Sequence, residues 1–322
     1  MSFSLPERFV IPEASHGQRL DLVLAQHFPE YSRSRWGEWL KQGKISCKGK
    51  ICRAKDKAQY GSELILNIQA ETEILVSSYT KAQNIPLNIV YEDDDLIIIN
   101  KPAGLIVHPG AGNPEHTLLN ALLHHYPDAK TLVRAGIVHR LDKETTGLMV
   151  IAKTAASQTN LIAQLQSREI KRSYLALVYG HLISGGEIHT FFGRHPKNRL
   201  KMAVLPQGKE ALTYYHIERQ YHEFTLLEVQ LASGRTHQIR VHMAHIKHPL
   251  IGDPLYGQRL SIPKGASDHL SEHLRNFKRQ ALHAARLNFT HPVSKKTLDF
   301  TAPLPEDFTQ LLSALDRHYG MD

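Results

Sequence analysis

Apolar and polar positions follow two different spacings along this chain, and together they predict both helices and strands. Apolar residues three or four positions apart predict a first helix over about 17–28. A second helix is expected to begin after an N-cap at Ser32 and to end at Gly43. Strict alternation over 63–68 then predicts a half-buried strand. The first part of the chain should therefore be a small unit of two short helices and a few strands.

A polar stretch without an apolar pattern, at about 71–84, separates this unit from a longer second part that begins near Ile85. Short apolar runs in the second part predict strands, and longer stretches with helical spacing predict helices. Thr117 is expected to cap one of these helices, and the last helix should begin near Pro305. The expected strands cover 89–91, 96–99, 137–138, 148–151, 171–178 and 225–231, a hairpin covers 281–305, and helices cover 117–126 and 155–166.

The loop between the strands expected at 137–138 and 148–151 combines charge with a buried setting. A charged loop fixed between buried strands is where a rigid scaffold commonly presents chemistry. Asp142 is a carboxylate with cations close by in sequence, and an anionic substrate would need those cations. An equally simple interpretation is a surface turn in which Asp142 caps a helix or bonds its own backbone. The polar side chains of this loop are His139, Arg140, Asp142, Lys143 and Glu144.

Composition narrows the class of protein. A chain of 322 residues is long enough for one large or two ordinary domains, and 42% hydrophobic with 22% charged residues is typical of soluble globular proteins. No apolar run approaches the length of a membrane span, and the first 17 residues do not resemble a signal peptide. Cys47 and Cys52 are too few for a disulfide framework or a four-ligand zinc site. A reducing, cytoplasmic setting is therefore expected.

Positive charge is concentrated in one segment of the first unit. The net charge of +8 favours a polyanionic partner. Between residues 32 and 60, nine cations stand against two acids, so seven positive charges fall in under a tenth of the sequence. A solvated surface usually mixes both signs, whereas a patch of one sign on a small helical module is typical of contacts with a phosphate backbone. The expected RNA contacts are Arg33, Arg35, Lys41, Lys44, Lys48 and Lys50.

Four stretches of the second part resemble motifs of the RluA family of RNA pseudouridine synthases. Thr146 stands where the family often has Ser, and Lys247 stands where many members have Gly. The resemblance runs from about 17 to 302, and the basic first unit is similar to the alpha-L RNA-binding module of a small-subunit ribosomal protein. The four stretches are HRLDKETTG at 139–147, KPAGLIVHP at 101–109, RSYLALVYG at 172–180 and GRTHQIRVH at 234–242.

This resemblance implies an α+β protein with the pseudouridine synthase fold. A small N-terminal alpha-L RNA-binding domain would precede a catalytic domain built on a long mixed, mostly antiparallel sheet. The corresponding division of the chain is an N-terminal extension at 1–16, an RNA-binding domain at 17–75, a linker at 76–84 and a catalytic domain at 85–322.

The resemblance also implies roles for individual residues. Asp142 would act on the sugar of a flipped-out uridine, either as a nucleophile at C1′ or as a base at C2′, with Arg240 as its cation partner. Tyr174 would lie against the base, although a lone tyrosine in a strand is more often part of a core. Arg140 would fill the space that the uridine leaves. The pocket walls would come from Leu141, Ile239 and His139.

An isomerisation gains and loses no atoms, so no cofactor is expected, and the chain has no glycine-rich phosphate loop. A cluster of histidines in the last motif and just after it would allow a metal site, since two of them can share a helical face. No cysteine or carboxylate completes a set at ligand spacing, and the family needs no metal. We therefore expect no metal, and histidines that bond loops or line an RNA channel: His237, His242, His245 and His248.

Within the family, the stretches at 85–102 and 108–114 resemble the RluD subgroup, whose members modify uridines in a stem-loop of large-subunit (23S) ribosomal RNA. The expected partner is this RNA or a pre-ribosomal particle, with no membrane and no small-molecule cofactor, and the chain is expected to be a monomer. Three other interpretations stay open: an RNA-binding ribosome-assembly factor without catalysis, a hydrolase that releases uracil, and a synthase that acts on transfer RNA. The presence of Asp142, Tyr174 and Arg240 together argues against a factor that only binds.

Overall fold

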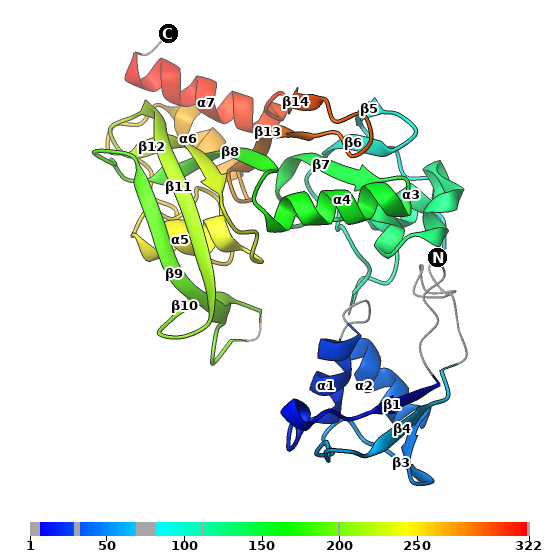
Figure 1. Cartoon of the computed structure of the whole chain (residues 1–322). Coiled ribbons are helices and arrows are strands. Elements are labelled where there is room, and N and C mark those ends of the chain that lie inside the picture. The colour runs from blue at the N-terminus through cyan, green and yellow to red at the C-terminus, as the bar shows by residue number, and fades with distance from the viewer. Residues whose placement is uncertain (1–6, 29–32, 69–80, 111, 199, 321–322) are drawn as a thin grey trace. The chain divides into compact units, whose positions relative to one another are not determined.

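A computed structural model describes residues 7–28, 33–68, 81–110, 112–198 and 200–320, without the side chains of Ser34 and Arg35. The chain forms two compact units, Met1–Ile74 and Leu75–Asp322 (Figure 1). Each unit has a hydrophobic core of its own. Within the described ranges, no helix combines the length and the apolar character that a membrane span needs.

The first unit packs two helices against a four-stranded antiparallel sheet of order β1-β4-β2-β3. Both expected helices are present, and the side chains of Trp36 and Trp39 are almost wholly buried between them and the sheet. The expected cap Ser32 lies outside the described residues. The alternating pattern at 63–68 forms β4, with its apolar face in the core. The elements are β1 (Arg8–Val10), α1 (Leu20–His27), α2 (Arg33–Lys41), β2 (Ile45–Cys47), β3 (Lys50–Ile51) and β4 (Glu63–Leu66).

The described part of the second unit forms a 10-stranded sheet of order β10-β9-β11-β12-β8-β13-β7-β6-β5, with β14 paired to β13. Strands β13 and β7 run parallel, and the other neighbouring strands in the described ranges run antiparallel. The long mixed, mostly antiparallel sheet is therefore confirmed. The strands are β5 (Ile89–Glu92), β6 (Leu96–Lys101), β7 (Thr146–Ala152), β8 (Lys171–Tyr179), β9 (Gly186–Arg194), β10 (Met202–Leu205), β11 (Lys209–Gln220), β12 (Phe224–Leu231), β13 (Leu282–Thr290) and β14 (Thr297–Thr301).

Helices cover both faces of this sheet. Side chains along a strand alternate between the two faces, and in the middle of the sheet both sets are apolar and need cover. In β8, Ala176 and Val178 pack in the core that includes α3 and α5. Leu177 and Tyr179 pack in the core that includes α6 and α7, and α4 lies along β7 (Figure 1). The middle of the sheet is thus enclosed. The helices are α3 (Leu118–His125), α4 (Ala155–Gln166), α5 (Gln238–His245), α6 (Asp268–Asn276) and α7 (Glu306–Tyr319).

The strand expected at 137–138 is wrong. Ile137 makes one isolated bridge to β7, directly after the 3-10 turn η3 (Arg134–Gly136). Gly136 has a φ of +79°, and a Cβ there would lie 1.9 Å from the carbonyl oxygen of Ala152. The two backbones approach so closely at this left-handed glycine that the chain turns before it can form a ladder.

Most other expected elements match the structure. Thr117 caps α3 through a capping box with Asn120, α4 has the expected bounds, and Pro305 directly precedes α7. The sequence pattern does not predict β9, β10, β11 or α6. In β9 and β11, buried positions are few and charged residues interrupt the apolar alternation, so the strands depend on their neighbours in the sheet for definition.

Part of the expected linker is bound to the second unit. The Gln83 N–H donates to the Asn120 carbonyl oxygen at 3.0 Å, and the Asn120 side chain donates to the Lys81 carbonyl oxygen at 2.8 Å. Residues 81–84 therefore lie along α3, while residues 76–80 lie outside the described ranges. These bonds explain why the second compact unit begins before Ile85.

Candidate active site

Asp142 lies in the loop that leads from η3 into β7, and the backbone of this loop is fixed at several points. The Thr145 N–H donates to the Asp142 carbonyl oxygen at 3.1 Å, so the chain turns directly after the carboxylate. The Lys143 carbonyl oxygen accepts from the Gly104 N–H at 3.0 Å. Gln280 donates to the Thr145 hydroxyl at 3.0 Å. The Asp142 side chain is 15% exposed, so it is held largely out of water.

A fully buried lysine braces the same loop. Lys101, the last residue of β6, donates through Nζ to the carbonyl oxygens of Pro102, Leu105 and Lys143 at 2.8, 3.0 and 2.9 Å. Burial lowers the pKa of Lys101 to about 7, and nearby carboxylates oppose that shift. An ammonium group carries three N–H donors and so satisfies all three carbonyls. Lys101 thereby ties the loop to the central sheet.

Arg240 on α5 pairs with Asp142. Its Nη1 donates to Asp142 Oδ2 at 3.0 Å. Its Nε and Nη2 donate to the two oxygens of Asp253 at 2.7 and 2.8 Å, and both side chains are 6% exposed or less. Asp253 also accepts the N–H groups of Leu255 and Tyr256 at 2.8 and 2.9 Å. Burial raises the pKa of Asp253, but these donors outweigh it and hold the pKa below its usual value. One guanidinium is thus locked between two carboxylates.

A histidine and a tyrosine complete the polar side of the site. His237 precedes α5 with a φ of +59°, and its Nε2 lies 3.8 Å from Asp142 Oδ1. Its Nδ1 lies 2.8 Å from the Tyr256 hydroxyl, which accepts the Met202 N–H at 2.7 Å. The Tyr256 ring also lies against Arg240, with 5.1 Å between Cζ and the ring centroid. Burial lowers the pKa of His237, and the charge of Asp142 opposes the shift, so the ring is neutral at neutral pH.

Three expected site residues belong to the same hydrophobic core. Tyr174 on β8, Leu141 and Ile239 are buried in one hydrophobic cluster. Burial raises the pKa of the Tyr174 hydroxyl, with Arg172 opposing the shift and Asp142 adding to it, so the hydroxyl stays protonated. A tyrosine that belongs to the core therefore also lies close enough to feel the charge of Asp142.

The two residues before Leu141 have different surroundings. Arg140 is exposed, and burial together with the charges of Arg134 and Arg140 lowers the pKa of His108 to about 4. The His139 Nε2 accepts the Val150 N–H at 3.0 Å, and burial lowers the pKa of His139 to about 3. His139 thus anchors the loop to β7, whereas Arg140 extends into solvent.

Two of the other expected histidines, His242 in the last motif and His248 just after it, lie in separate hydrogen-bond networks. His242 is buried, 2.8 Å from the Thr213 hydroxyl and 3.0 Å from the Thr190 hydroxyl. The His248 Nδ1 lies 2.8 Å from the carbonyl oxygen of Tyr179. These contacts fit histidines that join strands and loops to one another.

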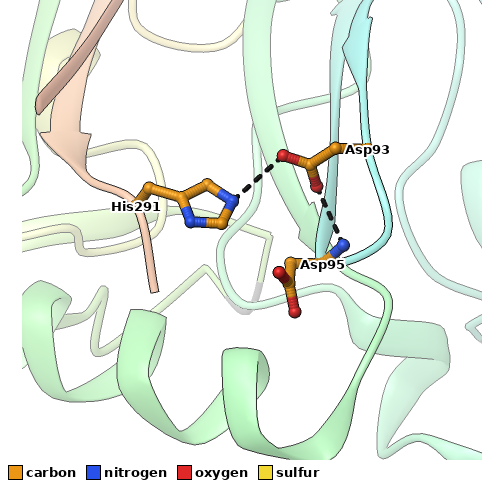
Figure 2. Close-up of side chains that lie close together, drawn as sticks. All are labelled: Asp93, Asp95 and His291. Atoms are coloured by element: carbon orange, nitrogen blue, oxygen red, sulfur yellow. Dashed lines mark hydrogen bonds and ion pairs between the residues drawn. The ribbon is translucent and has the colours of Figure 1, made fainter. Parts of the chain in front are cut away.

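One group with metal-ligand atoms occurs among the described residues, at a different end of the sheet. Asp93, Asp95 and His291 each bring a ligand atom within 4.8 Å of the others (Figure 2). One Asp93 oxygen accepts the N–H groups of Asp95 and Leu96 at 2.8 and 2.9 Å, and the other lies 2.7 Å from the Tyr91 hydroxyl and 3.0 Å from His291 Nε2. The second ring nitrogen of His291 accepts backbone N–H groups, so Nε2 carries the proton. These hydrogen bonds explain the group as a contact that joins the β5–β6 turn to the end of β13.

The expected RNA contacts of the first unit differ in their partners and their exposure. Arg33 donates through Nε at 3.0 Å to Asp21, a buried acid that Arg19 also holds in a bidentate pair. Lys44 is half-buried, and the side chain of Arg35 lies outside the described part. Arg33 is therefore held by an ion pair although half of its side chain is exposed, whereas Lys41, Lys48 and Lys50 are exposed and their side chains have no partner among the described residues.

Asp253, Tyr256 and Lys101 contact Arg240 or the loop of Asp142, although reasoning from the sequence assigns them no role in the site. Lys101 ends a strand that begins with four apolar residues, and a lone charge after such a run is a signal for a buried polar role. Asp253 and Tyr256 lie in a short stretch rich in glycine and proline, which indicates a turn but no partner. Their contacts with α5 and β10 join segments far apart in the sequence, so the fold is needed to reveal them.

The comparison with protein families and solved structures points in one direction. The model of the RNA pseudouridylate synthase family matches residues 95–245, which contain Asp142, Tyr174 and Arg240. The solved structure of human RNA pseudouridylate synthase domain containing 4 has a TM-score of 0.54 at 26% identity, over 71% of this chain and 92% of that chain. Human RNA pseudouridylate synthase domain containing 1 has a similar fold, with a TM-score of 0.53 at 24% identity over 70% and 86% of the two chains.

Curated relatives are more similar still. Ribosomal large subunit pseudouridine synthase D of Xanthomonas campestris pv. campestris is 51% identical over 306 residues, which cover 95% of this chain and 91% of that protein. The protein of the same name in Escherichia coli strain K12 is also 51% identical, over 95% of this chain and 93% of that protein. Similarity of this extent, over both units, leads to one conclusion: the chain belongs to the RNA pseudouridine synthases, in the group of ribosomal large subunit pseudouridine synthase D.

Proposed function

We propose that this chain isomerises specific uridines of large-subunit ribosomal RNA to pseudouridine, in a stem-loop of that RNA, with Asp142 as the single reacting carboxylate. The observation that carries the proposal is the Asp142 side chain, 15% exposed and 3.0 Å from a guanidinium that Asp253 holds in place. The relatives support the choice of RNA, because proteins 51% identical to this chain are named for the large ribosomal subunit.

The isomerisation breaks the bond between C1′ and N1 of uridine and forms one between C1′ and C5. C5 loses a proton and N1 gains one, so no oxidant, reductant or nucleotide enters the balance. Asp142 either adds to C1′ as a nucleophile or removes a proton from C2′ and later returns it. Both routes need one carboxylate with a fixed direction. Arg240 supplies that direction, since its Nη1 binds Oδ2 of Asp142 and does not occupy Oδ1.

Access to the sugar requires the uridine to leave the RNA stack, at a cost of a few kcal/mol. Arg140 is exposed two residues before Asp142, and its planar guanidinium can stack in the gap and bond phosphates. Tyr174 then packs against the flipped base, with Leu141 and Ile239 as apolar walls. The same cluster also keeps water away from the reacting sugar.

The first unit is assigned to RNA binding. We place this RNA-binding domain at 17–75, after an extension at 1–16, and the catalytic domain at 85–322, after a linker at 76–84. Exposed cations on α2 and the β2–β3 turn support it, because unpaired lysines can follow a phosphate backbone without a fixed partner. The proposed substrate is ribosomal RNA or a pre-ribosomal particle, bound by a monomer in the cytoplasm where that RNA is made.

The test is a map of pseudouridine in total RNA, by carbodiimide modification and primer extension, from cells with and without this chain. We expect one or a few marks to be lost from large-subunit ribosomal RNA. Wild type should restore them, and Asp142→Asn should not, because the amide neither attacks C1′ nor accepts a proton from C2′. An Asn variant that restores the marks contradicts the assignment of Asp142.

The same experiment separates the competing functions. Marks lost from transfer RNA would keep the chemistry and replace the substrate. An unchanged map would favour an RNA-binding assembly factor. Uracil released from the purified chain and RNA, detected by chromatography, would indicate a hydrolase instead.

A further inference from the structure

Two side chains contact the reacting carboxylate or its partner without a role in the proposed reaction. His237 lies between Asp142 and Tyr256, with its two ring nitrogens 3.8 Å from Asp142 Oδ1 and 2.8 Å from the Tyr256 hydroxyl. Arg240 occupies the other carboxylate oxygen, Oδ2. The two oxygens of Asp142 therefore face two different nitrogen groups, of which one belongs to His237.

The proton positions follow from the contacts of Tyr256. Its hydroxyl oxygen accepts the Met202 N–H at 2.7 Å, so its own proton is free to be donated. Donation to His237 Nδ1 satisfies both groups, whereas the reverse direction leaves the hydroxyl proton without an acceptor. A neutral His237 that accepts at Nδ1 must carry its proton at Nε2. The N–H of this ring then faces Asp142.

The position of Tyr256 is itself fixed on three sides. Its backbone N–H donates to Asp253 at 2.9 Å. Its ring lies 5.1 Å from the Arg240 guanidinium and meets the His237 ring edge to face, with 5.5 Å between the centroids. Met202, which donates to its hydroxyl, is the first residue of β10. The tyrosine thereby connects the β9–β10 hairpin to the carboxylate site.

We propose that His237 and Tyr256 are positioning residues, in which the Tyr256 hydroxyl holds the His237 ring so that its Nε2–H is directed at the free oxygen of Asp142. This inference rests on the proposed function of Asp142. At 3.8 Å the contact is longer than a hydrogen bond, and hydrogen bonds in a site without substrate commonly tighten when substrate binds. A donor on each oxygen fixes the carboxylate plane, and with it the direction of the reacting lone pair.

The backbone conformation of His237 allows a test in which a positioning role and a purely structural role predict opposite orders of activity for two variants. Its φ of +59° favours Asn over Gln, since Asn tolerates the left-handed region better. The amide of Asn reaches the position of Nδ1, whereas the amide of Gln reaches the position of Nε2. If His237 only shapes the turn before α5, the Asn variant is the better enzyme. If it directs an N–H at Asp142, the Gln variant is the better one.

The experiment compares His237→Asn, His237→Gln and Tyr256→Phe by kcat and KM for pseudouridine formation in large-subunit ribosomal RNA. We expect kcat to fall on the order of 10²-fold in the Asn variant. The Gln variant and Tyr256→Phe should each lose about tenfold. KM should change little, because neither residue is assigned to RNA binding.

The chain offers a matched control for each substitution. His291→Gln removes a histidine 3.0 Å from Asp93, far in sequence from the site, and Tyr221→Phe removes a hydroxyl 2.8 Å from Asp316. Both should keep the wild-type kcat. The inference is overturned if Asn equals or exceeds Gln, or if all three variants keep the wild-type kcat. If the wild type itself makes no pseudouridine, the proposed function of Asp142 has failed instead.

Discussion

The candidate active site and the basic surface of the first unit both carry charge, but they hold it in opposite ways. Around Asp142, the side chains of Arg240 and Asp253 are 6% and 0% exposed, and each polar atom that they present has a fixed partner. On the first unit, Lys41, Lys48 and Lys50 project into solvent. The difference follows from what each region must do.

In the proposed function, isomerisation of one nucleotide needs a single carboxylate in a single direction, and buried ion pairs can fix that direction. The proposed contact of the first unit with a phosphate backbone needs charge density and tolerates many side-chain positions. Substitutions in the two regions should therefore affect different quantities, stability and kcat in the first case and RNA affinity in the second.

Apart from replacement of Asp142 itself, the largest effect is expected from Asp253→Asn. This change leaves the buried guanidinium of Arg240 with only Asp142 as a charged partner, and the loss of one partner of a buried pair costs about 3–5 kcal/mol of unfolding free energy. The direction of Asp142 is lost with it, so kcat should fall on the order of 10²-fold. Urea unfolding and steady-state kinetics measure the two effects.

The matched control is Asp299→Asn. Asp299 pairs with Arg286 by two contacts, but the two side chains are 36% and 58% exposed, so this change should cost at most about 1 kcal/mol and leave kcat unchanged. Equal losses of stability in the two variants would contradict the view that burial sets the value of the active-site pair.

A smaller effect, on affinity alone, is expected when Lys41, Lys48 and Lys50 are all replaced by Glu. Lost phosphate contacts should weaken RNA binding by roughly 10–100-fold at moderate salt and flatten its dependence on salt by about one unit of slope for each contact. Filter binding at several salt concentrations measures both quantities. The triple Gln variant, which removes charge without reversing it, should fall between wild type and triple Glu. Unchanged affinity across salt would exclude this surface as an RNA contact.

A pH effect of about 1 kcal/mol is expected from Lys101. Its folded pKa, lowered by burial to about 7, lies below the ordinary value for lysine, so the unfolded chain binds more protons between these two values. Stability should therefore rise with pH through this window, by about 1 kcal/mol from pH 7 to pH 8.

The measurement for Lys101 is the difference in unfolding free energy between wild type and Lys101→Met, followed over pH. The Met variant loses three hydrogen bonds and should be less stable throughout, and its pH dependence should lack the slope that Lys101 contributes. Parallel curves for the two proteins would show that Lys101 does not titrate in this range.

The smallest effect is a loss of stability within the first unit, where the paired Arg33 can be compared with the exposed Lys41. Arg33→Met removes one of the two arginines that hold Asp21, while Arg19 remains, so the loss should be about 1 kcal/mol or less. Lys41→Met, on the same helix, should not change the melting temperature. If the two variants melt alike and both weaken RNA binding, Arg33 acts as a surface cation and its pair with Asp21 carries no stability.

The sequence predicts the regular parts of this fold well because they depend on local patterns. Helix α4 follows from its spacing, and α3 from its cap at Thr117. The strand expected at 137–138 failed because a contact between Gly136 and Ala152 decides the chain path there, and no local pattern records it. Strands β9 and β11 were not predicted because most of their side chains are not buried, so their sequences carry no clear apolar alternation.

The site shows the same division. Asp142, Tyr174 and Arg240 could be named from family-like motifs. Asp253 lies in a stretch that also resembles the family, but its contact with Arg240 could not be predicted, since the fold sets it against α5. Arg33 stays a predicted RNA contact on the binding side, and the structure adds what its charge alone does not indicate, a carboxylate partner at 3.0 Å.

The most direct test of the reacting carboxylate uses the purified chain and large-subunit ribosomal RNA labelled with tritium at C5 of uridine. Isomerisation releases the C5 hydrogen to water, so one turnover releases one label. We expect wild type to release tritium and form pseudouridine in equal amounts, and Asp142→Asn to lose on the order of 10⁴-fold in rate while binding the RNA equally well. Release from the Asn variant at a rate near wild type would contradict the assignment of Asp142 as the reacting group.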